Sequence, residues 1–221
     1  MNCGSLVETR ASGKAVWGGA MSRRVSALAL LVMATVAASC GDVIRQGTGS
    51  SYLIVNALEG SSGAEPGTFT ATLNSDVVTV VEGVPTIFND LGRARLRLAM
   101  KDVGTGAVAT TPTTNNFITI NRYHVRFVRA DGRNTPGVDV PYPFDGAVTT
   151  TIGVAEVTIP FELVRHVAKQ EAPLASLARN PTVISTIAEV TFYGLDQTGH
   201  EASVMAQMLV SFGNFGDPGG G

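Results

Sequence analysis

Two kinds of hydrophobic pattern divide the chain. Residues 25–38 form one largely apolar run without a charged residue, whereas the chain from residue 52 onward alternates between apolar and polar positions in short segments separated by turn residues. The apolar run is too short for a membrane-spanning helix, which needs about 20 residues. Alternation with a period of two is typical of β-strands that bury one face. The pattern therefore predicts a short apolar segment followed by a β-rich domain.

The segment 93–101 has the clearest alternation in the chain. Its apolar residues fall on one face of an extended strand and its basic residues on the other. The apolar set is Ala94, Leu96, Leu98 and Met100, and the basic set is Arg93, Arg95, Arg97 and Lys101. In the segment 117–129 the apolar parity changes near Asn121, which indicates a bulge or a strand that moves between sheets.

The segments 183–196 and 201–212 make the strongest β-hairpin. Their connection includes Gly199, which adopts positive φ at little cost. Further strands are predicted at 52–58, 68–73, 76–81 and 147–159, with long loops at 104–116 and 130–146. The segment 161–171 fits either a short helix after Pro160 or a continuation of the preceding strand, and we favour the helix. Its apolar face would hold Phe161, Val164, Val167 and Ala168.

About seven to nine strands with at most one short helix predict an all-β fold, an antiparallel β-sandwich over residues 52–213. The turn Leu-Asp-Gln-Thr-Gly-His-Glu at 195–201 is similar to the D-x-x-G-N type turn of bacterial immunoglobulin-like and fibronectin-like domains. That resemblance, which covers about 30 residues around the last hairpin, implies an immunoglobulin-like sandwich. The Cys–Trp–Cys core of antibody domains is absent, because Trp17 lies upstream of the apolar run.

The apolar run has the layout of an export signal. Arg23 and Arg24 precede it, and the small residues Ala37, Ala38 and Ser39 follow directly before Cys40. This arrangement resembles a bacterial lipobox, although Ala37 stands where lipoboxes usually carry leucine. The resemblance implies a diacylglycerol group on the Cys40 sulfur, and cleavage that frees its amine for a further acyl chain such as palmitate. An ordinary secretory signal cut at the same bond is the alternative, and a retained transmembrane anchor is a third reading.

The signal sets the expected domain organisation. Met21 is a better start than Met1, so residues 1–20 are interpreted as a mis-assigned start or a disordered extension. Residues 21–39 form the signal peptide, and residues 40–51 a flexible tether rich in glycine and serine. The β-sandwich follows over 52–213, and residues 214–221 form a disordered Gly/Pro tail.

Charge and cysteine content narrow the range of functions that the domain could have. Removing residues 1–39 takes four basic residues and Glu8 from totals of 16 basic and 18 acidic, which leaves 12 basic and 17 acidic residues. A mildly acidic domain is a poor candidate for nucleic-acid binding, which relies on a basic surface. Of the two cysteines, Cys3 lies in the extension and Cys40 is the proposed anchor. We therefore expect no disulfide, no thiol nucleophile and no cysteine-based metal site.

The sequence contains none of the common catalytic or metal-binding motifs. His124, His166 and His200 do not have the spacing of metal-ligand pairs, although His200 lies beside Asp196 and Glu201 in a turn. The chain has no G-x-S-x-G, no phosphate-binding loop and no dinucleotide fingerprint. We therefore expect no metal, no cofactor and no enzymatic activity.

Two sets of residues are candidates for binding. If the strands at 93–101 and 117–129 pair, their arginines form one basic face for an anionic partner. The set is Arg93, Arg95, Arg97, Arg122, Arg126 and Arg129; a solvated face that discourages edge aggregation is the alternative. Tyr142 and Phe144 are the candidates for an aromatic ligand contact, such as a sugar platform, unless their loop packs them back on the core.

These observations predict a lipoprotein of the cell envelope. Its export and its Cys40 anchor would hold it at the cell membrane or the outer membrane, and its domain would serve as a non-enzymatic binding or structural module. The expected partners are the membrane itself and an envelope protein or glycan, and not nucleic acid. The alternatives are an envelope hydrolase with a site built from loops and a carbohydrate-binding module that uses Tyr142 and Phe144.

Overall fold

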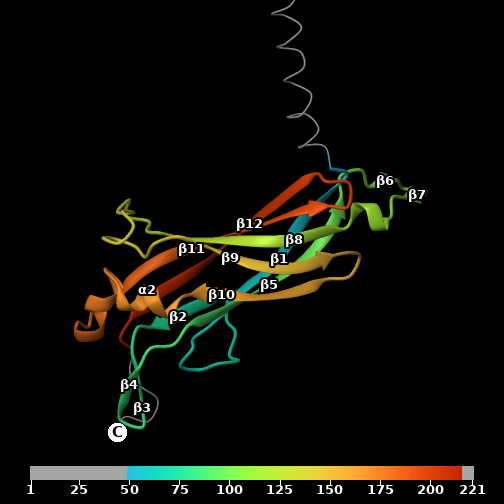
Figure 1. The fold of residues 1–221 in the computed structure, drawn as a ribbon. Helices are drawn as coiled ribbons and strands as arrows, with labels where there is room; N and C mark the ends of the chain where they lie inside the picture. The colour runs from blue at the N-terminus through green and yellow to red at the C-terminus, as the bar shows by residue number, and fades with distance from the viewer. Residues whose placement is uncertain (1–48, 216–221) are drawn as a thin grey trace, which may run out of the picture. The chain divides into compact units, whose positions relative to one another are not determined.

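A computed structural model describes residues 49–215, which fold into two facing β-sheets (Figure 1). The first sheet has the order β1 (Ser51–Ser61), β5 (Asp90–Met100), β10 (Val157–Val164). The second has the order β2 (Thr72–Asp76), β12 (Glu201–Gly213), β11 (Ile184–Asp196), β8 (Ile118–Val128), β9 (Phe144–Ile152). Neighbouring strands are antiparallel except β2 and β12, which are parallel. The predicted all-β sandwich is confirmed.

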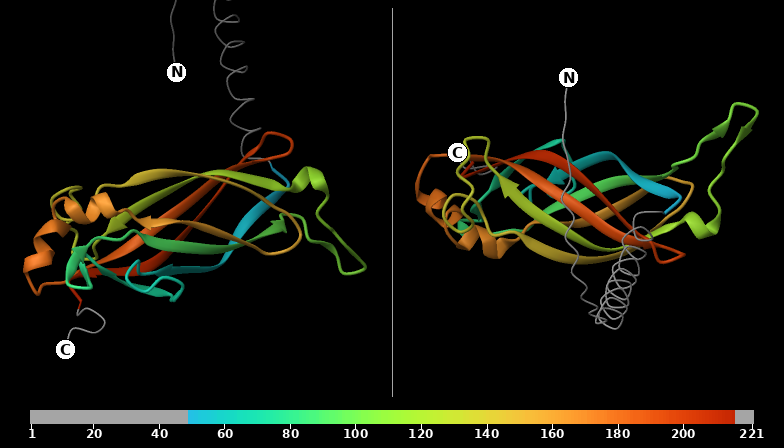
Figure 2. Two further views of the ribbon diagram at one scale, coloured as in Figure 1. Left: turned by 60° about the horizontal axis from the view of Figure 1, so that its bottom comes forward. Right: turned by 90° about the horizontal axis from the view of Figure 1, so that it is seen from above.

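Smaller elements occupy the two ends of the sandwich. Near the start of β1 lies a hairpin of β6 (Gly104–Thr105) and β7 (Val108–Ala109), followed by the 3₁₀ turn η1 (Thr114–Asn116). Figure 2 shows this hairpin projecting beyond the sheets. At the opposite end lie the hairpin of β3 (Thr79–Val81) and β4 (Val84–Thr86), the helix α2 (His166–Gln170) and the 3₁₀ turn η2 (Leu174–Arg179) (Figure 1).

The alternation read from the sequence matches the buried faces of the main strands. In β5, Ala94, Leu96 and Leu98 are buried and the arginines between them are more exposed. In β8 the pairing with β11 slips by one residue at Asn121, so that Ile120 and Tyr123 both point into the core. The predicted bulge is therefore confirmed. So is the last hairpin, β11–β12, in which Gly199 has a φ of 88°.

Other sequence-based boundaries were wrong. Residues 161–164 are not helical but continue β10, because they pair with the start of β5, and the helix covers only 166–170. The strands expected at 68–73 and 76–81 are found at 72–76 and 79–81. The strand expected at 147–159 is two strands, β9 and β10, which belong to different sheets, so the chain crosses between sheets after residue 152.

A cluster of aromatic rings joins the two sheets in the core. Phe161 of β10 lies against Tyr123 of β8 and Phe192 of β11, with ring centroids 5.2 Å and 5.5 Å apart. Two glycines make room for these rings, since a Cβ atom on Gly92 would overlap the Phe161 ring and one on Gly146 would overlap the Tyr123 ring. The absence of a side chain at these two strand positions therefore lets large rings fill the space between the sheets.

Replacing Gly92 with alanine should destabilise the domain by about 1–3 kcal/mol, because an added methyl group in a filled core displaces the Phe161 ring. The measurement is the free energy of unfolding from urea titration. Gly106→Ala is the matched control, because a Cβ atom there meets nothing within 4 Å and the φ of Gly106 is not in the left-handed region. Equal stability of the two variants would contradict this account of the core.

Candidate functional site

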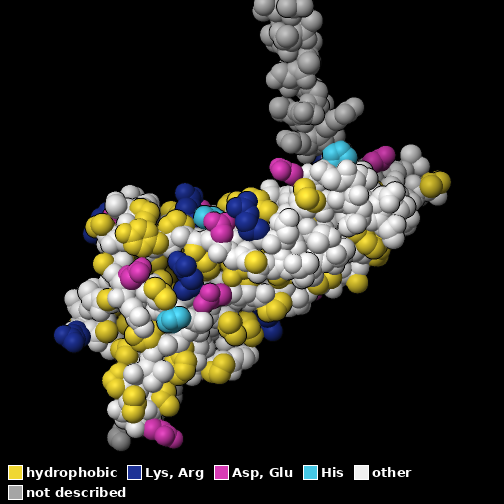
Figure 3. Space-filling model, viewed as in Figure 1, with side chains coloured by type: hydrophobic (Ala, Val, Ile, Leu, Met, Phe, Trp, Pro, Cys, Tyr) yellow, Lys and Arg dark blue, Asp and Glu magenta, His cyan; other side chains and the backbone are white. Residues whose placement is uncertain are grey.

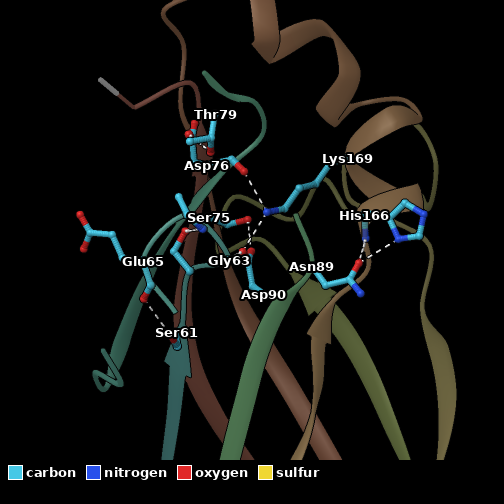
Figure 4. A network of polar contacts seen from close by, with 12 residues as sticks. Ser61, Gly63, Glu65, Ser75, Asp76, Thr79, Asn89, Asp90, His166 and Lys169 are labelled. Atoms are coloured by element: carbon cyan, nitrogen blue, oxygen red, sulfur yellow. Dashed lines mark hydrogen bonds and ion pairs between the residues drawn. The ribbon is translucent and has the colours of Figure 1, made fainter. Parts of the chain in front are cut away.

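The most enclosed polar group in the described residues is an ion pair between Lys169 of α2 and Asp90 at the start of β5 (Figure 4). Lys169 Nζ lies 2.8 Å from Asp90 Oδ1, and the two side chains are 1% and 0% exposed. Lys169 also donates to the backbone carbonyl oxygen of Asp76, at 2.8 Å. Charged side chains are almost never buried so completely unless they are paired, because an isolated charge loses its hydration.

The remaining hydrogen-bonding capacity of the Asp90 carboxylate is used by two further donors. The backbone N–H of Gly63 donates to Oδ1 at 2.9 Å, and the Ser75 hydroxyl donates to Oδ2. Burial raises the pKa of Asp90, while Lys169, Ser75 and the Gly63 N–H act to lower it. Four segments distant in sequence therefore meet at one carboxylate: the loop after β1, β2, β5 and α2.

Asp76 extends this network toward the chain terminus. Its carboxylate accepts a hydrogen bond from the Thr79 hydroxyl at 2.7 Å and another from the backbone N–H of Phe215 at 3.1 Å. At the edge of the network, Asn89 Oδ1 accepts from the backbone N–H of His166, the first residue of α2, at 2.7 Å. Neither charged group of the Lys169–Asp90 pair is open to solvent, so the network is built to hold segments together rather than to act on a ligand.

Sequence reasoning missed this pair, although two signals for it exist. Asp90 has the same parity as Gly92, Ala94 and Leu96, so extending the β5 alternation backward places its carboxylate on the buried face. Lys169 is one of only two lysines after Cys40, and it follows Val167 and Ala168 in a weakly polar segment. A rare lysine and an inward-facing aspartate, considered together, would have suggested a buried partner for each.

The predicted arginine face does not form as one surface. Its two strands lie in different sheets, since β5 pairs with β1 and β10 whereas β8 pairs with β9 and β11. On the side of the molecule shown in Figure 3, basic and acidic side chains are interspersed. Each arginine has a polar partner: Arg93 with Glu59, Arg95 with Glu156, Arg97 with Asn56, Arg122 with Asp145, Arg126 with Glu189 and Arg129 with Asp131. The hydrogen bond from Arg93 lowers the pKa of Glu59, and that from Arg129 lowers the pKa of Asp131.

The two predicted aromatic contacts are also separated. Phe144 is 7% exposed and lies in the core beside Tyr123, with the Arg165 guanidinium 4.3 Å from its ring centre. Tyr142 is 52% exposed and its ring lies over Gly137. The expectation of a paired aromatic platform is therefore corrected, because Phe144 begins β9 with its side chain on the inner face.

The three histidines lie apart, on β8, at the start of α2 and in the β11–β12 turn. His200 in the turn contacts both Thr198 Oγ1, at 2.7 Å, and Asp196 Oδ2, at 3.1 Å, through its Nδ1 atom. A nucleophile–base–acid relay needs the hydroxyl and the carboxylate on opposite ring nitrogens, so this trio does not have that geometry. Within residues 49–215, no group of three or more His, Cys, Asp or Glu side chains is placed to hold a metal ion.

An open hollow of about 600 Å³ lies on the outer face of the five-stranded sheet, at the β8 bulge. Its lining includes Asn121, Arg122, Tyr193, Glu201 and Ser203. The Arg122 guanidinium stacks on the Tyr193 ring, 4.2 Å from its centre, and forms an ion pair with Asp145 at 3.1 Å. An aromatic ring with hydrogen-bonding side chains around it suits a small polar ligand. Sequence reasoning named Arg122 but not Tyr193.

Comparisons of the chain with family models, curated proteins and solved structures found no match. The immunoglobulin-like and lipobox resemblances therefore stay predictions. The extension 1–20, the signal 21–39, Cys40, the tether up to residue 48 and the tail from 216 lie outside the described residues. Between residues 49 and 215, no helix is long and apolar enough to cross a membrane.

Replacing Lys169 with methionine should cost about 3–5 kcal/mol of unfolding free energy, because Asp90 is then left charged and uncompensated in the core. The double variant Lys169→Met with Asp90→Asn should recover part of that loss, since it removes the buried charge. Both are measured by urea unfolding.

Arg95→Met is the control for this prediction, because its partner Glu156 is 4.0 Å away and both side chains are more than a third exposed. Exposed ion pairs contribute little to stability, so its cost should stay below about 1 kcal/mol. A Lys169→Met cost no larger than that of Arg95→Met would contradict the structural role of the ion pair.

Proposed function

We propose that the protein is an exported lipoprotein, held at the cell membrane or outer membrane by acyl chains on Cys40. Its β-sandwich then serves as a non-enzymatic binding or structural module of the cell envelope. The observation that carries the proposal is the segment 22–40: two arginines, a short apolar run, three small residues and a cysteine. Cys40 is the only cysteine that the mature chain would keep, which leaves acylation as its simplest use.

The number of residues between Cys40 and the folded domain supports this proposal. Nine residue steps separate it from Gly49, the first described residue. A fully extended segment of that length spans about 30 Å, which lets a sandwich that begins at Ser51 fold clear of the lipid surface. The segment contains three glycines and one threonine, and two serines follow it, a composition typical of a flexible linker.

A binding role fits the described side chains better than a hydrolytic one. The most enclosed charged pair, Asp90 and Lys169, is shut off from solvent, and the His200 turn lacks the geometry of a catalytic relay. The Tyr193 hollow, by contrast, presents a ring, a guanidinium and a carboxylate to solvent together. It is the best placed surface for a small polar envelope ligand, and this observation favours a glycan as the second candidate.

Changing Cys40 to serine should abolish acylation. In the wild-type protein, we expect the N-terminal peptide to begin at Cys40 and to carry acyl chains, as measured by mass spectrometry, and the protein to enter the detergent phase on phase separation. Cys3→Ser is the matched control and should leave both results unchanged. A wild-type protein recovered with an unmodified Cys40 in the aqueous phase would refute the lipid anchor.

Replacing Tyr193 with alanine should weaken retention on envelope glycans roughly 5- to 30-fold, since a contact of about 1–2 kcal/mol is lost. The measurement is affinity electrophoresis in gels that contain the glycan. Tyr142→Ala is the control, because Tyr142 is exposed on a loop outside the hollow. If neither variant changes retention, or if only Tyr142→Ala does, the hollow is not the ligand site.

A further inference from the structure

The most exposed large apolar side chains of residues 49–215 lie at one end of the sandwich. Val103, Val108 and Val154 are 75%, 72% and 70% exposed. Val103 and Val108 belong to a projecting segment, residues 102–113, which we call the arm and which contains β6 and β7. Val154 lies in the connection between β9 and β10. A group of exposed valines suits a surface that meets an apolar environment. Val138 and Val84, at the opposite end, are 66% and 62% exposed, so the choice between the two ends depends on where the chain leads back to Cys40.

This end is also the one from which the chain leads back to Cys40. The backbone N–H of Lys101, just before the arm, donates to the Ser50 carbonyl oxygen at 2.9 Å. After the arm, the Asn116 side chain donates to the Ser50 hydroxyl at 2.6 Å, and the Asn116 carbonyl oxygen accepts from the Ser51 hydroxyl at 2.7 Å. Both ends of the arm are therefore fastened to the first described residues.

The Val154 connection lies beside the same group of residues. Gly153 lies against the ring of Phe117, which directly follows Asn116. The arm, the Val154 connection and the start of β1 thus share one end of the molecule (Figure 2). Given the length of chain from Cys40 to Gly49, that end lies within about 30 Å of any lipid attached to Cys40.

The arm lacks the packing that would keep its hairpin folded in water. Its strands share only two residue pairs, Gly104 with Ala109 and Thr105 with Val108. Most residues from 102 to 113 are exposed. An isolated two-stranded hairpin is marginally stable in water, so an arm of this kind gains order from a surface that it contacts.

The charge pattern indicates what kind of surface that is. Residues 103–121 contain no charged side chain, and the nearest flanking carboxylates are Asp102 and, beside Val154, Glu156. The arm carries one charge, that of Asp102, and Lys101 directly before it balances that charge. The arm therefore has no net positive charge to attract it to anionic headgroups. Burial of valine side chains in the apolar part of a bilayer interface is the favourable interaction that it can make.

We propose that the arm and the Val154 connection rest on the bilayer that holds the acyl chains of Cys40, and so fix the orientation of the sandwich on the membrane. This inference rests on the proposed lipid anchor. The opposite end carries another apolar hairpin, β3–β4, in which Val84 is 62% exposed. In this orientation Val84 points away from the lipid, and it supplies an internal comparison.

Tryptophan fluorescence tests the inference, because the chain has a single tryptophan, Trp17, which lies ahead of the signal. In the full chain carrying Trp17→Phe, one variant receives Val108→Trp and a second receives Val84→Trp. Val154→Trp is a further reporter in case the first disturbs the arm. Each protein is purified from membranes and reconstituted into phosphatidylcholine vesicles with brominated acyl chains, and flotation measures its binding to the vesicles.

We expect all the variants to float. The emission of the tryptophan at position 108 should shift to shorter wavelength and lose roughly half of its intensity, because an interfacial side chain sits about 5–10 Å deep in the bilayer. The tryptophan at position 84 should be unquenched, and neither result should depend on salt. Floating proteins in which the two reporters are quenched equally, or not at all, would overturn the orientation while leaving the anchor intact. Failure to float would instead overturn the anchor, and this inference with it.

Discussion

The ion pair between Asp90 and Lys169 determines how one end of the sandwich is built. A carboxylate without exposure is tolerable only when its charge is balanced and its oxygens have donors. Asp90 meets both conditions by drawing on Lys169, Ser75 and the Gly63 N–H. Each donor comes from a different segment, so the loop after β1, the strand β2 and the helix α2 must all be in place before the charge is satisfied. The interaction therefore selects one arrangement of these segments over looser ones.

The same constraint explains why a helix of five residues is ordered at all. A helix this short is not stable by itself. Here Lys169 fastens it to β5, the Asn89 side chain receives the N–H of its first residue, and Leu174 and Leu177 just after it are buried in the core. The segment 165–179 thus closes one end of the sandwich, whereas the other end is left with the exposed arm.

Local features of the fold could be predicted from the sequence, and pairings distant in sequence could not. The alternation of Ala94, Leu96 and Leu98 with arginines can be read within one segment. The bulge at Asn121 can be read in the same way, from a change of parity within its own strand. Whether Arg95 and Arg126 share a face depends on which strands pair, and no local pattern encodes that. Residues 161–164 were mistaken for helix because the three-residue spacing of Phe161 and Val164 matches a helix face, whereas pairing with β5 makes the segment a strand. The Tyr193 hollow escaped notice for a similar reason, since it needs β8, β11 and β12 side by side.

The layout of β1 and β12 has a mechanical consequence. The turn before β12 touches Gly49, beside the start of β1. β12 ends about 40 Å further along at Gly213, and the backbone N–H of Phe215, two residues later, is hydrogen-bonded to Asp76. A pull between the two ends of the described chain is therefore directed along the strands. Hydrogen bonds between strands run across that direction, so such a load shears many of them together instead of opening them one at a time. Anchored at its first strand and pulled at its last, the sandwich would be loaded in the direction in which a sheet resists best.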